Sequence, residues 1–426
     1  MKQLLAFQGP ASSRSGYGDH TRDLLTSLIK MDRFEIKIND MPWGVCPRDG
    51  LKKGIHDDII RRIMKEPKLD RQPDVFVQCS VPNEFSPIGK FNIGITAGIE
   101  TTVCSVDWIQ GLNRMDVNIV PSEHSKKVFL ETVYDQKDRQ GNIVGSLKSE
   151  KPIEVLFEGV NTKVFNSKNE IPESINDMFR DLPEKFCYLV CGHWLKGDFG
   201  HDRKDLATTI RCFLETFKKT PEPKRPALIL KTSMATFSVT DRENLLETIQ
   251  NLRRSSGIKN PPEVYLLHGD LTEEEMNGLY NHHKVKAMVS FTKGEGYGRP
   301  LAEFSTTGKP IIVSNWSGHL DFCKYVLKLG GEIQQVHQSA VWDKVILPEA
   351  KWFYVNPTYA SGVIKEVFNN YKKYKDQAKK QKSHINKNFS LEGMDLEFAK
   401  IMDKYIPERK EIKLPKLKLP KLKATV

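Results

Sequence analysis

The sequence contains a glycine-rich turn followed by a proline, Lys293-Gly294-Glu295-Gly296-Tyr297-Gly298-Arg299-Pro300-Leu301-Ala302-Glu303. It follows an apolar run, Ala287 to Phe291, which is typical of a buried strand. Its glycines let the backbone approach a ligand closely, and Pro300 suits the first turn of a helix that Gly308 and Pro310 end. Because a helix start presents free N–H groups and a positive dipole end, the segment predicts a diphosphate site.

Glu303 lies about one turn into this predicted helix. Helical side chains lean toward the N-terminus, so its carboxylate can reach back over the same site and accept both hydroxyls of a ribose. The competing interpretation is that the glycines only shape a tight turn and that Glu303 is a solvated helix residue. The turn alone does not decide between these two.

Short apolar runs alternate with amphipathic helical patterns along most of the chain. The 426 residues are more than a single hydrophobic core usually serves. Alternation of this kind predicts an α/β protein with two parallel, doubly wound sheets. The predicted strands of the first sheet are Leu4 to Phe7, Phe34 to Ile38, Val75 to Cys79, Asn92 to Thr96 and Val117 to Val120. Those of the second are Ile153 to Leu156, Cys187 to Cys191, Ala227 to Leu230, Val264 to Leu267, Ala287 to Phe291 and Ile311 to Ser314.

The polar stretch Asp135 to Lys151 interrupts the alternation and predicts the domain junction. We therefore expect domains over residues 1–150 and 151–385, a helix within 386–408 that packs back on the first domain, and a basic tail over 409–426. Further helices are predicted at Tyr359 to Tyr374 and Leu391 to Tyr405. Rossmann dehydrogenases and sugar kinases fit this architecture too, but the first turn, Gln8 to Gly18, lacks the Gly-x-Gly-x-x-Gly pattern of hydride-transfer enzymes.

Two glutamates separated by seven residues, Glu295 and Glu303, resemble the glutamate pair of retaining glycosyltransferases of family 4. The resemblance extends over most of the chain and implies the GT-B fold, in which two Rossmann-like domains face a central cleft. It rests also on Ser15-Gly16-Tyr17-Gly18, Pro121-Ser122-Glu123-His124, the segment from Phe157 to Phe165, the segment from Gly308 to Ser314, and Gly318.

The resemblance implies that Glu303 holds the nucleotide ribose and that Glu295 and the following backbone hold the transferred sugar. His268-Gly269-Asp270-Leu271 falls where the family packs the base. The implied donor-binding residues are Gly16, Gly18, His193, Lys204, His268, Asp270, Leu271, Gly296, Tyr297, Gly298, Leu301 and Glu303.

The family also uses an arginine and a lysine to neutralise the departing diphosphate, since fixed cations lower the barrier to its departure. Lys204 matches the lysine best. Gly192 is followed by His193 where the family has arginine, so either Arg203 or His193 takes that place. On the acceptor side Glu100 stands where many members have histidine, and it either orients a hydroxyl or is a buried structural carboxylate. The implied catalytic residues are Glu295, Lys204, Arg203 and Glu100.

No pair of aspartates has the Asp-x-Asp spacing of metal-dependent transferases, so no metal is implied, and no tightly bound cofactor. A UDP- or GDP-sugar is the expected substrate. Seven scattered cysteines, the lack of a long apolar run and an N-terminus that suits a first strand predict a reduced, cytoplasmic protein.

The net charge of +11 is concentrated in residues 371–390 and in the Lys-Leu-Pro tail at 409–426, which leaves the rest close to neutral. Such runs are most often solvated faces, but they also suit an anionic membrane or a nucleic acid. Three functions therefore stay open: a transferase acting on a glycan, lipid or small-molecule acceptor, a nucleic-acid-directed transferase, and a non-catalytic GT-B binding protein.

Overall fold

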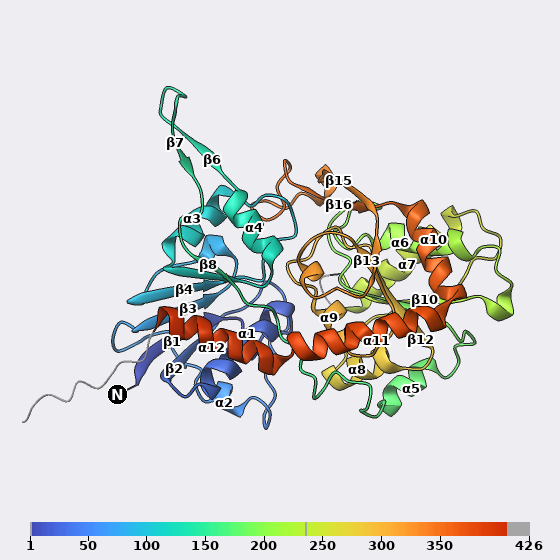
Figure 1. Ribbon diagram of the computed structural model, residues 1–426, viewed down its shortest axis with the longest axis horizontal. Helices are drawn as coiled ribbons and strands as arrows, with labels where there is room; N and C mark the ends of the chain where they lie inside the picture. Colours follow the sequence, from blue (N-terminus) through green and yellow to red (C-terminus); the bar gives the residue numbers. More distant parts are fainter. Residues whose placement is uncertain (1, 235–236, 407–426) are drawn as a thin grey trace, which may run out of the picture.

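The computed structural model describes residues 2–234 and 237–406, and the predicted basic tail at 409–426 lies outside them. The chain forms an N-terminal and a C-terminal half, each built around a six-stranded parallel sheet covered by helices (Figure 1). All seven cysteines are free thiols. No helix of the described residues combines the length and the apolarity that crossing a bilayer requires.

The sheet of the N-terminal half has the strand order β2-β1-β3-β4-β5-β8. Its strands are β1 (Gln3–Gly9), β2 (Phe34–Asp40), β3 (Val75–Cys79), β4 (Phe91–Ile95), β5 (Val117–Val120) and β8 (Ile153–Val155). The prediction that Ile153 to Leu156 opens the second sheet is wrong, because β8 pairs in parallel with β5. A three-residue apolar run does not reveal which sheet it joins; here it covers an edge that β5 would otherwise expose.

The sheet of the C-terminal half has the order β11-β10-β9-β12-β13-β14. Its strands are β9 (Cys187–Cys191), β10 (Ala227–Lys231), β11 (Val264–Leu267), β12 (Val285–Ser290), β13 (Ile311–Ser314) and β14 (Leu327–Leu329). Since β9 and β12 lie side by side at the centre, the loops after them meet at one edge of the sheet, where parallel folds bind ligands.

The helices of the N-terminal half are α1 (Gly16–Lys30), α2 (Asp57–Ile60), α3 (Val106–Arg114) and α4 (Glu123–Glu131). Those of the C-terminal half are α5 (Glu173–Phe179), α6 (Leu206–Phe217), α7 (Val239–Ser255), α8 (Glu273–Asn281), α9 (Arg299–Ser305), α10 (Pro357–Asn369) and α11 (Tyr371–Asn388). The helix predicted from Tyr359 to Tyr374 is therefore two helices that meet at Asn370.

Two antiparallel hairpins complete the described fold. The polar stretch predicted as the domain junction forms the first, β6 (Tyr134–Lys137) with β7 (Ile143–Leu147), which projects from the N-terminal half (Figure 1). The second pairs β15 (Gly331–Gln335) with β16 (Lys351–Val355). The chain passes from one sheet to the other only after β8.

The last described helix, α12 (Leu391–Tyr405), returns to the N-terminal half and packs against α1 (Figure 1). Met394, Phe398 and Met402 are fully buried in the same core as Leu24 and Leu28 of α1. Their spacing of four places them on one face of the helix. The core of the N-terminal half is therefore completed by residues from the far end of the described chain.

Replacing Phe398 by Ala should lower the free energy of unfolding by about 3 to 5 kcal/mol, because it removes a fully buried ring and leaves a cavity. Leu396 on the same helix is 66% exposed, so Leu396→Ala should change the free energy of unfolding by less than about 0.5 kcal/mol. Urea unfolding followed by circular dichroism measures both. Equal losses in the two variants would contradict the packing of α12.

Candidate functional site

The glycine-rich loop between β12 and α9 lies directly against the N-terminal half. A Cβ added to Gly294 would come 1.9 Å from the carbonyl oxygen of Glu100, and one added to Gly296 would come 2.0 Å from that of Ala97. Gly298 precedes α9 with a φ of 102°, which favours glycine. The loop can therefore follow this path only with glycine, and it places the start of α9 at the seam between the halves.

All four residues predicted as catalytic come together at this seam. The Glu295 carboxylate lies 2.5 Å from Lys204 Nζ and accepts from Arg203 Nη1 at 3.0 Å. Arg203 Nε is 3.8 Å from Glu100 Oε1, and Arg203 Nη1 also donates to the Gly294 carbonyl at 2.8 Å. Burial alone would raise the pKa of Glu295, but Lys204 and Arg203 outweigh it and hold that pKa well below its usual range. The site is thus a carboxylate permanently ionised between two cations.

A second buried ion pair, which was not predicted, positions those cations. Lys293 is fully buried and lies 3.0 Å from Asp205 Oδ2, and it donates to the Asp202 carbonyl at 2.8 Å. Its own backbone N–H donates to the Arg203 carbonyl at 2.7 Å. Burial lowers the pKa of Lys293, and Asp205 opposes that shift. Lys293 therefore ties the segment that carries Arg203 and Lys204 to the glycine-rich loop.

The two candidates for the second cation differ in charge. His193 Nδ1 lies 2.9 Å from Ser233 Oγ, and burial, with a smaller effect of Lys204, lowers its pKa to about 4. It is therefore uncharged at neutral pH. Arg203 carries a full charge, because Glu295 and Glu100 more than offset the effect of burial on its pKa. Of the two, only Arg203 presents a cation beside Lys204.

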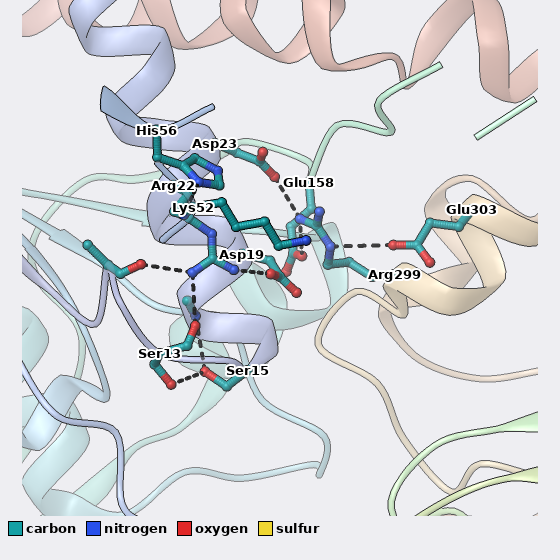
Figure 2. A network of polar contacts seen from close by, with 12 residues as sticks. Ser13, Ser15, Asp19, Arg22, Asp23, Lys52, His56, Glu158, Arg299 and Glu303 are labelled. Carbon is teal, nitrogen blue, oxygen red and sulfur yellow. Dashed lines mark hydrogen bonds and ion pairs between the residues drawn. The ribbon is translucent and has the colours of Figure 1, made fainter. Parts of the chain in front are cut away.

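Glu303 belongs to a polar network around Arg299 (Figure 2). Arg299 Nη1 lies 2.8 Å from Asp23 Oδ2 on α1 and 3.5 Å from Glu158 Oε2, and its Nε is 3.7 Å from Glu303 Oε1. Tyr280 donates its hydroxyl to Glu303 Oε2 at 3.1 Å. Arg299 thus joins the helix that carries Glu303 to the N-terminal half.

Arg299 was not among the predicted site residues, although its spacing of four residues from Glu303 on a helix brings the two side chains together. The partners Asp23 and Glu158 are distant in sequence and carry no comparable signal. Burial raises the pKa of Glu303 to about 8 against the opposing charge of Arg299, and it raises that of Glu158 to about 7. Burial therefore favours the protonated form of Glu303, and the charge of Arg299 favours the ionised form.

The predicted phosphate loop lies at the start of α1. Ser15 caps this helix by accepting from the Gly18 N–H, and a Cβ added to Gly18 would come 2.0 Å from the Ser13 carbonyl oxygen. Gly16 has open space in that direction. Because α1 also carries Asp23, the partner of Arg299, this loop and α9 approach the seam from opposite halves.

The segment predicted to pack the base follows β11. His268 Nε2 lies 2.8 Å from Asp241 Oδ2, so its ring is already engaged. Asp270 forms an ion pair with Arg14 of the N-terminal half, and Leu271 is half-buried beside the core. Lys231, which was not predicted, donates to the Gly269 carbonyl at 2.6 Å and adds a cation at the same end of the sheet.

Two predicted donor residues are core residues. Tyr297 is 2% exposed and Leu301 is 4% exposed, and both side chains pack in the hydrophobic core of the C-terminal half. Their side chains are therefore not available to a ligand. Over residues 2–234 and 237–406, no group of three or more His, Cys, Asp or Glu side chains is arranged to hold a metal ion.

No protein-family model and no curated protein matches this sequence. Solved structures resemble it in shape at low identity. A glycosyltransferase from Rickettsia africae matches with a TM-score of 0.63 and 13% identity over 96% of this chain and 100% of that one.

A sucrose-phosphate synthase from Thermosynechococcus elongatus matches with a TM-score of 0.61 and 12% identity over 95% of this chain and 99% of that one. Anabaena HepE, solved with UDP and glucose, matches with a TM-score of 0.59 and 10% identity over 94% of this chain and 100% of that one. At such identities the likeness establishes the fold alone. The protein therefore has the two-domain GT-B fold that these glycosyltransferases share.

Proposed function

We propose that this chain is a retaining glycosyltransferase that moves a sugar from a nucleoside-diphosphate sugar to an acceptor hydroxyl. The observation that carries the proposal is the position of Glu295 between Lys204 and Arg203, beside the start of α9 at the seam of a GT-B fold. Fixed cations, a glycine-rich backbone and a helix start are what a diphosphate requires.

In this proposal Lys204 and Arg203 stabilise the charge that develops on the departing diphosphate. Lys204 has three N–H donors and Arg203 has five, so each keeps donors for phosphate oxygens beyond those that Glu295 accepts. Glu295 holds both cations in place before the donor arrives. The site therefore needs little reorganisation during the reaction, which is the main source of electrostatic catalysis.

The two ends of the donor would be held by the two glutamates. Glu303, near the start of α9, accepts the ribose hydroxyls, and Glu295 with the backbone of Gly296 to Gly298 holds the transferred sugar. Glu100, whose pKa is raised by burial against the effect of Arg203, faces the site from the N-terminal half and orients an acceptor or sugar hydroxyl. Front-face attack needs no strong enzymatic base, because the leaving phosphate takes the acceptor proton.

A UDP-sugar is the first donor to test, because Anabaena HepE was solved with UDP and with UDP-glucose. A GDP-sugar is the second. Membership of family 4 and a cytoplasmic setting, which suits seven free thiols, are part of the same proposal. The acceptor is a hydroxyl of a glycan, a lipid or a small molecule.

Lys204→Met should lower kcat/KM for release of nucleoside diphosphate from the donor by about 10²- to 10³-fold, because one fixed donor to the developing charge is lost. Lys127→Met on α4, where the lysine is 70% exposed, should leave it unchanged. A coupled assay with UDP-, GDP-, ADP- and CDP-sugars measures both variants. Wild-type protein that turns over none of them would instead support a non-catalytic binding protein, and full activity in Lys204→Met would contradict the role of this lysine.

Glu303→Gln should become more stable relative to the wild type as the pH rises from about 5 to 8. The pKa of Glu303 is about 8 in the folded protein against an ordinary value of 4.5, so the folded state binds more protons across this range. The wild type therefore loses stability as the pH rises, by at most about 1.4 kcal/mol per pH unit from this group. Urea unfolding at several pH values tests this. A stability difference that does not change with pH would show that Glu303 is ionised throughout.

A further inference from the structure

The helix α11 carries seven lysines, six of them exposed. Its buried face is formed by Ala378, Gln381 and Ile385, which pack toward the C-terminal half. With 3.6 residues per turn, the lysines lie away from this buried face, except Lys382, which flanks it and is half-buried. They are Lys372, Lys373, Lys375, Lys379, Lys380, Lys382 and Lys387, and we call this set the α11 surface.

Few acidic groups balance the α11 surface. Asp376 pairs with Lys379 at 2.7 Å, and Glu366 lies 3.9 Å from Lys373. Within the described part of the chain, Lys372, Lys375, Lys380 and Lys387 form no ion pair with an acid, and all four are exposed. The helix therefore concentrates positive charge instead of sharing it with neighbouring carboxylates.

Further lysines lie beneath and beside this helix. Lys309, in the loop before β13, donates to the carbonyls of Tyr280 and His282 at 2.7 and 2.9 Å. Burial, with added repulsion from Lys286 and Lys375, lowers its pKa to about 7. Lys168 beside Lys382 adds to the same field. Like charges gathered in this way destabilise a fold, so the surface suits an anionic partner that relieves the repulsion.

The surroundings of the α11 surface favour a nucleic acid over a membrane. A helix that lies on a bilayer presents an apolar face beside its basic one. The apolar face of α11 is buried, and none of the exposed large apolar side chains in the described chain comes from α11 or from residues 282–286 and 308–309. Binding here would depend on charge alone, as with a phosphodiester backbone.

We propose that the α11 surface binds the phosphate backbone of a nucleic acid. From Lys372 to Lys387 the helix extends about 22 Å, the length of about six phosphates of one strand. It ends where α12 begins, beside the boundary between the two halves (Figure 1). A strand held along α11 therefore runs toward the boundary between the two halves.

The test is the salt dependence of binding to a short DNA duplex and to an RNA duplex of the same sequence, with the full chain. The variant carries Lys372→Gln, Lys375→Gln, Lys380→Gln and Lys387→Gln, none of which breaks an ion pair. The slope of log K against log salt, measured between about 50 and 200 mM, should become less steep by roughly 3 to 4 on the duplex that binds. The duplex that shows the change identifies the kind of nucleic acid.

The matched control removes four exposed lysines from other faces, with Lys65→Gln, Lys68→Gln, Lys219→Gln and Lys224→Gln. It should keep the wild-type slope, although its net charge falls by the same amount. An equal change in both variants, or no change in the α11 variant, overturns the proposal. So does wild-type binding to vesicles of phosphatidylcholine and phosphatidylserine without binding to either duplex. Donor turnover by the α11 variant should equal that of the wild type, because these lysines lie outside the donor site.

Discussion

The buried ion pair between Lys293 and Asp205 is the interaction on which the candidate site depends. It joins two segments that come from different strands of the C-terminal sheet, the loop after β9 and the loop after β12. A buried lysine is stable only when it is paired and hydrogen-bonded, and removing one partner of such a pair costs about 3 to 5 kcal/mol. Because Arg203 and Lys204 lie directly before Asp205, the pair also fixes where their charges stand.

The seam between the halves is built from close backbone contacts and from paired charges. Gly294 and Gly296 allow the C-terminal loop to touch the N-terminal backbone, and Arg299 connects α9 to Asp23 on α1. Of the proposed donor residues, Arg203 and Asp270 also cross the seam, through Glu100 and Arg14. A ligand that takes over the donors of Arg203 would therefore change a contact across the seam.

The sequence predicts the parts of this protein that follow local rules. The strand positions follow from apolar runs, and Glu295, Lys204, Arg203 and Glu100 indeed meet in space. The length of α11 was missed because its buried face offers only three residues within a run of lysines. The sheet of β8 was missed because pairing is a tertiary property. The structure alone reveals the partners of Arg299 and the burial of Lys293, since both depend on residues distant in sequence.

The central claim is that Lys204, Arg203 and Glu303 form a nucleotide-sugar site at the start of α9. A crystal structure with bound UDP, or with GDP if UDP does not bind, tests it most directly. We expect diphosphate oxygens within about 2.7 to 3.2 Å of Lys204 Nζ and of the Arg203 guanidinium, and ribose hydroxyls on the Glu303 carboxylate. A nucleotide bound elsewhere, with Lys204 and Arg203 still in contact with Glu295, would contradict the account.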